Sequence, residues 1–131
     1  MAKHDPLETL RQIRGFALEA GELAAKGSRN ELESNLGYRR HAERIAELIG
    51  EAATRLPAGI RTAWPEVPWR QIISMRNWLI HGYDGIDADI LWDVLDSRAA
   101  ELVEKLDEII AFLSTAGHEM FASEEPQAPE A

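Results

Sequence analysis

The stretch that decides the fold class is residues 87–113, DADILWDVLDSRAAELVEKLDEIIAFL. Its apolar side chains recur every three or four residues over about seven helical turns, which places them on one face of an α-helix. Aspartate is a common helix N-cap, and glycine often follows a helix C-terminus. We therefore expect one amphipathic helix that begins after Asp87 and ends near Gly117, with its apolar face packed on other helices.

Two more helices are predicted upstream. The Asp5-Pro6 pair has the pattern of an N-cap followed by proline at the first helical position, and it predicts a helix over residues 6–26. Asn30 is expected to cap a second helix that ends at about residue 56. Within that helix, we interpret Gly50 as a point of close helix packing rather than as a helix end.

Residues 57–69 form the connector to the next helix. They contain three prolines and two tryptophans, so we expect a packed loop with one short helical turn. Pro68 is expected at the first position of a helix that ends near His81-Gly82. No stretch alternates with period two for long enough to be a strand. The sequence thus predicts an all-α, up-and-down four-helix bundle in a domain of residues 1–117, followed by a flexible acidic tail, 118–131.

Composition bounds the class of protein. The chain has 131 residues, of which 45% are hydrophobic and 28% charged, as in one globular domain. It has no cysteine, which excludes disulfides, thiolate metal sites and cysteine nucleophiles. No apolar stretch approaches the roughly 18 residues of a membrane span, and the N-terminus lacks the apolar core of a signal peptide. We expect a soluble cytoplasmic protein with no membrane contact.

The net charge of −9 at first argues against a nucleic-acid partner. The acidity is confined to one half, because residues 1–83 carry a net charge of +2 and residues 84–131 carry −11. Two interpretations remain open for the acidic half: a solvated helix face and tail, or a surface that docks on a basic partner protein.

A candidate site lies in the predicted helix that ends near His81. Arg76, Asn77 and His81 are polar residues among isoleucine, leucine and tryptophan. At about 100° per residue, His81 lies roughly 40° around the helix axis from Asn77 and roughly 140° from Arg76. Asn77 could therefore hold the imidazole in one tautomer, whereas Arg76 reaches His81 only if the helix end distorts or if a second subunit supplies the partner.

The chemistry of this pair suits RNA cleavage without a metal. A histidine can pass the proton of the attacking 2′-hydroxyl or of the leaving oxygen, and an arginine can offset charge on the phosphoryl group. The structural alternative is a polar network that closes the end of a buried helix. Glu51 could pair with Arg76 or Arg70 in either case, or be an exposed glutamate.

A basic, partly aromatic cluster offers candidate RNA contacts. It comprises Tyr38, Arg39, Arg40, His41 and Arg44, and Arg70 is a further candidate. Such side chains can bind phosphates, although a solvated face explains them equally well. We expect no metal site and no cofactor, because the four histidines are scattered and no phosphate-binding glycine loop is present.

The segment Arg76-Asn77-Trp78-Leu79-Ile80-His81-Gly82-Tyr83 resembles the R-N-x-x-x-H-x-Y signature of the HepT-like branch of the HEPN superfamily. Residues 50–52, 67–75 and 87–95 also look like that branch, and the resemblance covers about residues 5–115. It implies a homodimeric HEPN helical bundle with Arg76 and His81 as catalytic residues of a metal-independent endoribonuclease with an R-x4-H-x-Y motif.

The resemblance further implies a toxin of a HepT–MntA (type VII) toxin–antitoxin system. Its antitoxin would be a minimal nucleotidyltransferase of the MntA type, which adds AMP to the motif tyrosine, here Tyr83. Phosphates two residues from His81 would repel an RNA phosphate. Two other hypotheses remain: a non-catalytic HEPN subunit that binds nucleotide or the transferase, and a purely structural helical dimer.

Overall fold

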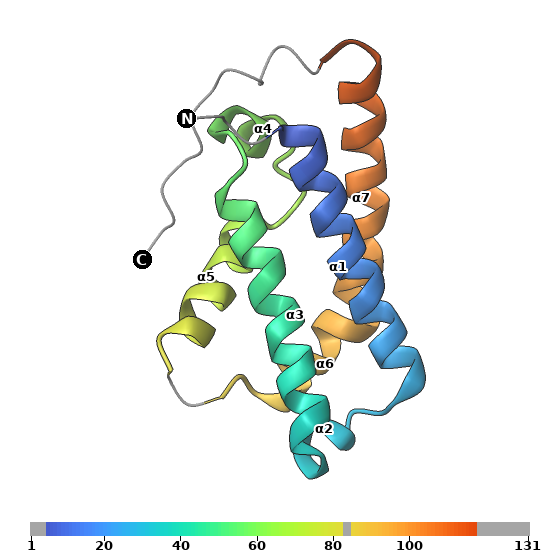
Figure 1. Cartoon of the computed structure of the whole chain (residues 1–131), viewed down its shortest axis with the longest axis vertical. Coiled ribbons are helices and arrows are strands. Elements are labelled where there is room, and N and C mark those ends of the chain that lie inside the picture. The colour runs from blue at the N-terminus through green and yellow to red at the C-terminus, as the bar shows by residue number, and fades with distance from the viewer. Residues whose placement is uncertain (1–4, 83–84, 118–131) are drawn as a thin grey trace.

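The computed structural model describes residues 5–82 and 85–117, and every element in these ranges is helical (Figure 1). The elements in chain order are α1 (Pro6–Lys26), α2 (Glu31–Ser34), α3 (Leu36–Thr54), α4 (Ala58–Ala63), α5 (Trp69–Ile80), α6 (Ala88–Asp93), the π-helical turn η1 (Val94–Arg98), α7 (Ala99–Phe112) and a second π-helical turn, η2 (Leu113–Gly117). The predicted all-helical bundle is thereby confirmed, and the predicted tail lies outside the described residues.

The first helix has the predicted bounds and the predicted cap. The Asp5 carboxylate accepts a hydrogen bond from the backbone N–H of Leu7 at 3.0 Å, and Pro6 occupies the first helical position. The helix ends at Gly27, whose N–H donates to the carbonyl of Ala24. Local capping chemistry therefore determines both ends of α1.

The prediction of one helix from Asn30 to about residue 56 is wrong at its start. The chain forms the short α2, leaves helical geometry at Asn35 (φ −125°, ψ 102°), and then begins α3. The Asn35 side chain accepts from the N–H of Tyr38 at 3.1 Å, whereas the Asn30 side chain makes no capping hydrogen bond. An asparagine side chain can cap a helix at either position, so the sequence permits a helix start at Asn30 or at Asn35. The structure uses the Asn35 side chain.

The connector and the motif helix follow the prediction with one correction. Residues 57–69 contain the short helix α4. Pro68 is the residue before α5 rather than its first residue, and its carbonyl accepts from the N–H of Ile72 at 3.0 Å. The helix ends at His81 and Gly82, as expected.

The long C-terminal helix is capped at Asp87, whose carboxylate accepts from the N–H of Asp89 at 2.8 Å. It is not regular throughout, because α6 and α7 are joined by the π-helical turn η1. A π-helical turn accommodates one extra residue and rotates the following helix face. Buried Leu95 lies in this turn, which packs against α1, so tertiary packing accounts for an irregularity that apolar spacing alone did not reveal.

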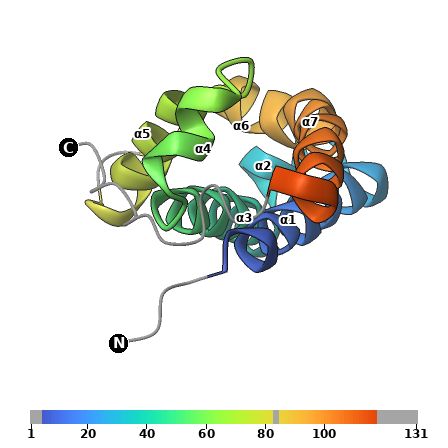
Figure 2. The same ribbon diagram turned by 90° about the horizontal axis from the view of Figure 1, so that it is seen from above.

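The helices pack in the order α5, α3, α1 and α7, with neighbours in contact (Figure 1). Seen from above, α4 and α6 lie on the opposite side of the bundle from α1 and α3, and α5 lies at one edge (Figure 2). The core is aliphatic, with Ile13, Ile45, Leu56, Leu95 and Leu106 among its fully buried side chains. None of the described helices is long and apolar enough to cross a membrane.

Gly50 lets α3 and α5 approach each other closely. A Cβ atom at position 50 would overlap the Cβ of Arg76 and lie 2.9 Å from the carbonyl oxygen of Ile72. The Ile72 oxygen belongs to the backbone and the Cβ of Arg76 is attached directly to it, so neither atom can move unless the helix moves. The close-packing interpretation of Gly50 is confirmed, and it places the next residue, Glu51, beside Arg76.

We expect Gly50→Ala to lower the free energy of unfolding by about 1–3 kcal/mol, because α5 must move away from α3. Urea denaturation followed by circular dichroism measures this change. Gly15→Ala is the matched control: Gly15 is exposed on α1 with nothing near its missing Cβ, so alanine should raise stability by roughly 0.5–1 kcal/mol. Unchanged stability of Gly50→Ala would refute the close-approach argument.

Candidate active site

The candidate site is the C-terminal end of α5. The N–H of His81 still donates to the carbonyl of Asn77 at 3.2 Å, and the N–H of Gly82 donates to the carbonyl of Leu79 at 3.4 Å. Gly82 then adopts a positive φ of 71°, a conformation that glycine takes without steric penalty. The chain therefore leaves the helix immediately after His81, which is exposed at this end.

Arg76 is oriented by two partners. Its Nε and Nη2 atoms donate to one carboxylate oxygen of Glu51, at 2.9 and 2.6 Å, and its Nη1 donates to the side-chain oxygen of Asn77 at 2.7 Å. The Arg76 side chain is 15% exposed, and that of Glu51 is 44% exposed. Charge-assisted bonds of this kind hold a guanidinium in one plane, and of the two cations predicted for Glu51, Arg76 is the one that it binds.

His81 is held through its Nδ1 atom, which lies 2.7 Å from the backbone carbonyl oxygen of Asn77. A carbonyl oxygen can only accept a hydrogen bond, so Nδ1 carries the proton in this arrangement. In the neutral ring, Nε2 then carries the lone pair, and Nε2 is the atom that can take a proton from a substrate.

Asn77 therefore contacts both candidate catalytic residues, but not in the predicted way. Its backbone carbonyl, rather than its side chain, fixes the imidazole of His81, and its buried side chain binds Arg76 instead. The i, i+4 spacing correctly identified the pair, but spacing cannot show which atom of Asn77 bonds to the ring. Arg76 and His81 lie at different angles around the helix axis, and Asn77 contacts both of them.

The residues of the predicted basic cluster differ in exposure and in the partners that they bind. Tyr38 is half-buried and its hydroxyl donates to the carbonyl of Leu23 at 2.6 Å; burial raises the pKa of this tyrosine. Arg39 is bound by Glu43 and by the carbonyl of Ile86. The exposed members are Arg40, His41 and Arg44, with His41 paired to Glu19 and Arg44 to Glu47. Arg70 is exposed on α5.

Tyr83, the predicted modification site, lies outside the described residues. Within the ranges 5–82 and 85–117, no three His, Asp or Glu side chains gather closely enough to hold a metal ion.

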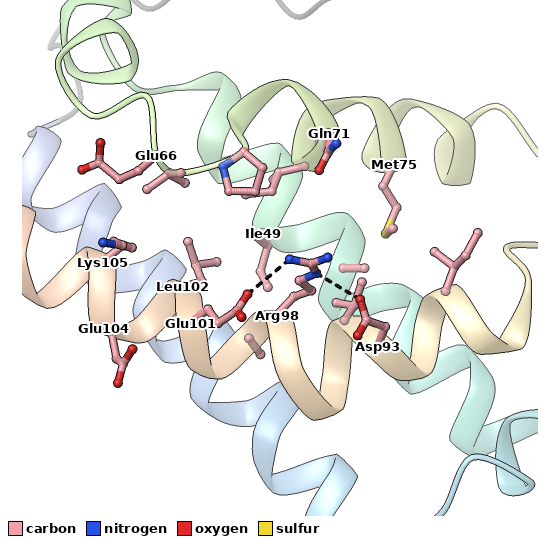
Figure 3. Close-up of a pocket in the computed structure, with 17 residues that line it drawn as sticks. Ile49, Glu66, Gln71, Met75, Asp93, Arg98, Glu101, Leu102, Glu104 and Lys105 are labelled. Atoms are coloured by element: carbon pink, nitrogen blue, oxygen red, sulfur yellow. Dashed lines mark hydrogen bonds and ion pairs between the residues drawn. The ribbon is translucent and has the colours of Figure 1, made fainter.

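The structure also contains a groove that the sequence did not predict. It has a volume of about 570 Å³ and lies between α5 and the helix formed by α6, η1 and α7 (Figure 3). Ile49 and Met75 line it, and the Arg98 guanidinium lies within it between Asp93 and Glu101. The hydrogen bond that Arg98 donates to Asp93 is the main cause of the raised pKa of Arg98. Arg76 and His81 do not line the groove, whose walls come from elements too distant in sequence for spacing to connect.

Comparison with known proteins connects this geometry to a family. Residues 4–109 match the family model described as Ribonuclease HepT-like. A Methanocaldococcus jannaschii protein named "Putative RNase" is 31% identical over 107 residues, which cover 82% of this chain and 98% of that protein. The "Probable ribonuclease HepT" of Thermococcus cleftensis is 36% identical over 66 residues, or 50% of this chain and 60% of that protein.

Another Methanocaldococcus jannaschii protein carrying the name "Putative RNase" is 37% identical over 67 residues, and the match spans only 55% of its length. No solved structure gives a significant match to the chain. The family model covers most of the described helices, including both helices that carry the site. The chain therefore belongs to the ribonuclease HepT-like family of HEPN helical proteins.

Proposed function

We propose that this protein is a metal-independent endoribonuclease in which Arg76 and His81 carry out catalysis. In this mechanism a base removes the proton of an RNA 2′-hydroxyl, the 2′-oxygen attacks the adjacent phosphorus, and the 5′-oxygen leaves with a proton. The products are a 2′,3′-cyclic phosphate and a 5′-hydroxyl. Nε2 of His81 takes one of these protons or gives the other, and Arg76 offsets the charge that builds on the phosphoryl oxygens.

The observation that carries this proposal is the bond between His81 Nδ1 and the Asn77 carbonyl, together with the Arg76–Asn77 bond. The first bond fixes the tautomer whose Nε2 can accept a proton. The second fixes a cation on the same residue. A histidine oriented through one nitrogen and reactive through the other is the arrangement that general acid–base catalysis requires.

Arg76 retains donors for a phosphate. A guanidinium has five N–H groups, and three of these are used by Glu51 and Asn77. The remaining two, one on each terminal nitrogen, match the spacing of two phosphate oxygens. Glu51 therefore orients Arg76 without using up its capacity to bind an anion.

A homodimer would complete the site. Arg76 and His81 point in different directions around α5, so an arginine from one copy and a histidine from the other can face one phosphate. Exposed apolar side chains near the site support an interface, because Trp78 and Ile80 are both exposed on α5 next to His81.

A minimal nucleotidyltransferase of the MntA type would neutralise the enzyme, as the family suggests, by adding AMP to Tyr83. The position of Tyr83, two residues after His81, supports this role, because an added phosphate would occupy the place of the RNA phosphate. The protein would then be the toxin of a toxin–antitoxin pair.

A non-catalytic role is the second candidate. The contacts that favour it are those from Arg76 to Glu51 and Asn77, because a fully oriented arginine also suits a polar network that closes the end of a helix. On that hypothesis the domain would bind a nucleotide or the transferase without cleaving RNA. The following experiment separates the two roles.

We expect the purified wild-type protein to cleave RNA in the presence of EDTA. His81→Ala should lower the rate by about 100- to 10,000-fold, because general acid–base catalysis is worth that much. Gel analysis of RNA fragments measures the rate, and thermal unfolding verifies that the variant is folded. Arg11→Ala, an exposed change on α1, is the control and should retain activity. Cleavage by His81→Ala at the wild-type rate would overturn the assignment.

Mixing two inactive variants tests the shared site. If one copy supplies Arg76 and the other His81, then a heterodimer of Arg76→Ala and His81→Ala contains one intact site out of two. Unfolding and refolding an equal mixture should restore roughly a quarter of the wild-type activity. A mixture as inactive as its components would show that each site uses its own arginine and histidine.

Tyr83→Phe tests neutralisation. With a cognate nucleotidyltransferase and ATP, the wild-type protein should gain the mass of one or more AMP groups and lose RNase activity. The phenylalanine variant lacks the accepting oxygen, so its mass and activity should both stay unchanged. Mass spectrometry combined with the RNA cleavage assay measures both effects. AMP found on the phenylalanine variant would place the modification at another residue.

A further inference from the structure

Away from Arg76 and His81, Arg39 of α3 makes two contacts within the protein. Its Nε donates to Glu43 at 3.0 Å, and its Nη2 donates to the backbone carbonyl of Ile86. Both side chains of the pair are about four-fifths covered, at 21% and 24% exposed. An arginine committed in this way to the protein's own backbone is poorly placed to bind RNA.

The backbone at Gly85 lies against the side chains of Arg39 and Glu43. A Cβ atom at position 85 would lie 2.8 Å from Nη2 of Arg39 and 3.6 Å from a carboxylate oxygen of Glu43. A side chain at this position would have to push the terminal atoms of the Arg39 guanidinium aside. Ile86 adds an apolar contact, because its half-buried side chain packs against the core. Ile86 is therefore held to α3 by one hydrogen bond from Arg39 and packs against the core, and Gly85 lies against the same guanidinium.

These two residues end the segment that leaves the candidate site. The segment starts at Gly82, immediately after His81, and it ends where Asp87 caps α6. At Gly82 the segment is joined to the last turn of α5, which is closed by two hydrogen bonds of 3.2 and 3.4 Å. End turns of helices open easily, because few bonds hold them. The bond from Arg39 to Ile86 restrains the other end, only five residues from His81.

We propose that Arg39, supported by Glu43, is a positioning residue for His81. It holds the chain at Gly85 and Ile86, and this keeps the last turn of α5 closed, so that the imidazole stays bonded to the Asn77 carbonyl. This inference rests on the proposed RNase function for its kinetic consequence. Its structural consequence, the environment of His81, is measurable whether or not the protein cleaves RNA.

Three variants test the positioning role. Arg39→Ala removes the bond to Ile86, and Gly85→Ala pushes the guanidinium away without changing any charge. Gly85 does not have a positive φ, so alanine adds no backbone strain there. Arg11→Ala removes the same charge from α1, where the side chain is exposed and lies outside the basic cluster. It is therefore the matched control for charge and for helix propensity.

We expect Arg39→Ala and Gly85→Ala to lower kcat for RNA cleavage by about 10- to 100-fold with little change in KM, because the catalytic imidazole is displaced. In both variants the His81 ring resonances in ¹⁵N NMR spectra should shift away from those of the Nδ1-protonated form. Arg11→Ala should leave kcat and the His81 resonances unchanged.

Two results would overturn the proposal. One is a raised KM with unchanged kcat in Arg39→Ala that is absent from Arg11→Ala and Gly85→Ala, which would make Arg39 an RNA contact. The other is an unchanged His81 spectrum in folded Arg39→Ala and Gly85→Ala. Failure of the proposed function is separate: it is the absence of RNA cleavage by the wild-type protein, and the spectra still decide the positioning role in that case.

Discussion

The approach of α3 to α5 at Gly50 is the constraint on which both the fold and the candidate site depend. Because position 50 has no side chain, the Cβ of Arg76 and the carbonyl of Ile72 can lie against it. The adjacent carboxylate of Glu51 then reaches the Arg76 guanidinium, and Arg76 in turn reaches Asn77. A wider separation would remove the Glu51 contact first, and it would leave a largely covered cation without its counter-charge, which is costly.

Local chemistry made most of the fold predictable. The ends of α1, the cap at Asp87 and the short helix α4 follow from residues within a few positions of each element, so spacing and capping rules located them. The break at Asn35 and the π-helical turn η1 were not predictable. Two nearby asparagines could each cap a helix, and the sequence does not say that Asn35 does so, whereas η1 packs against α1, an element distant in sequence.

The same limit applies to the site. Residue types and spacing identified Arg76, Asn77, His81 and Glu51, because polar residues on an apolar helix call for partners. They did not identify which atoms bond. The imidazole binds a backbone oxygen, which no side-chain pattern encodes. Arg39 shows the same limit, since its place in a basic cluster gives no sign that its guanidinium donates to the carbonyl of Ile86.

The acidic second half of the chain fits an RNase better once its contacts are known. Part of its charge is paired within the protein, since Asp107 binds Arg14 and Asp89 binds Arg29. These pairs are exposed and stabilise the fold little, but they occupy cations that would otherwise attract RNA without specificity. Arg76 differs from them in being largely covered and in keeping two N–H groups beyond its internal bonds. Binding of a phosphate at the proposed site would therefore depend on the geometry at Asn77 rather than on net charge, and weak non-specific attraction is compatible with the proposal that two copies share the site.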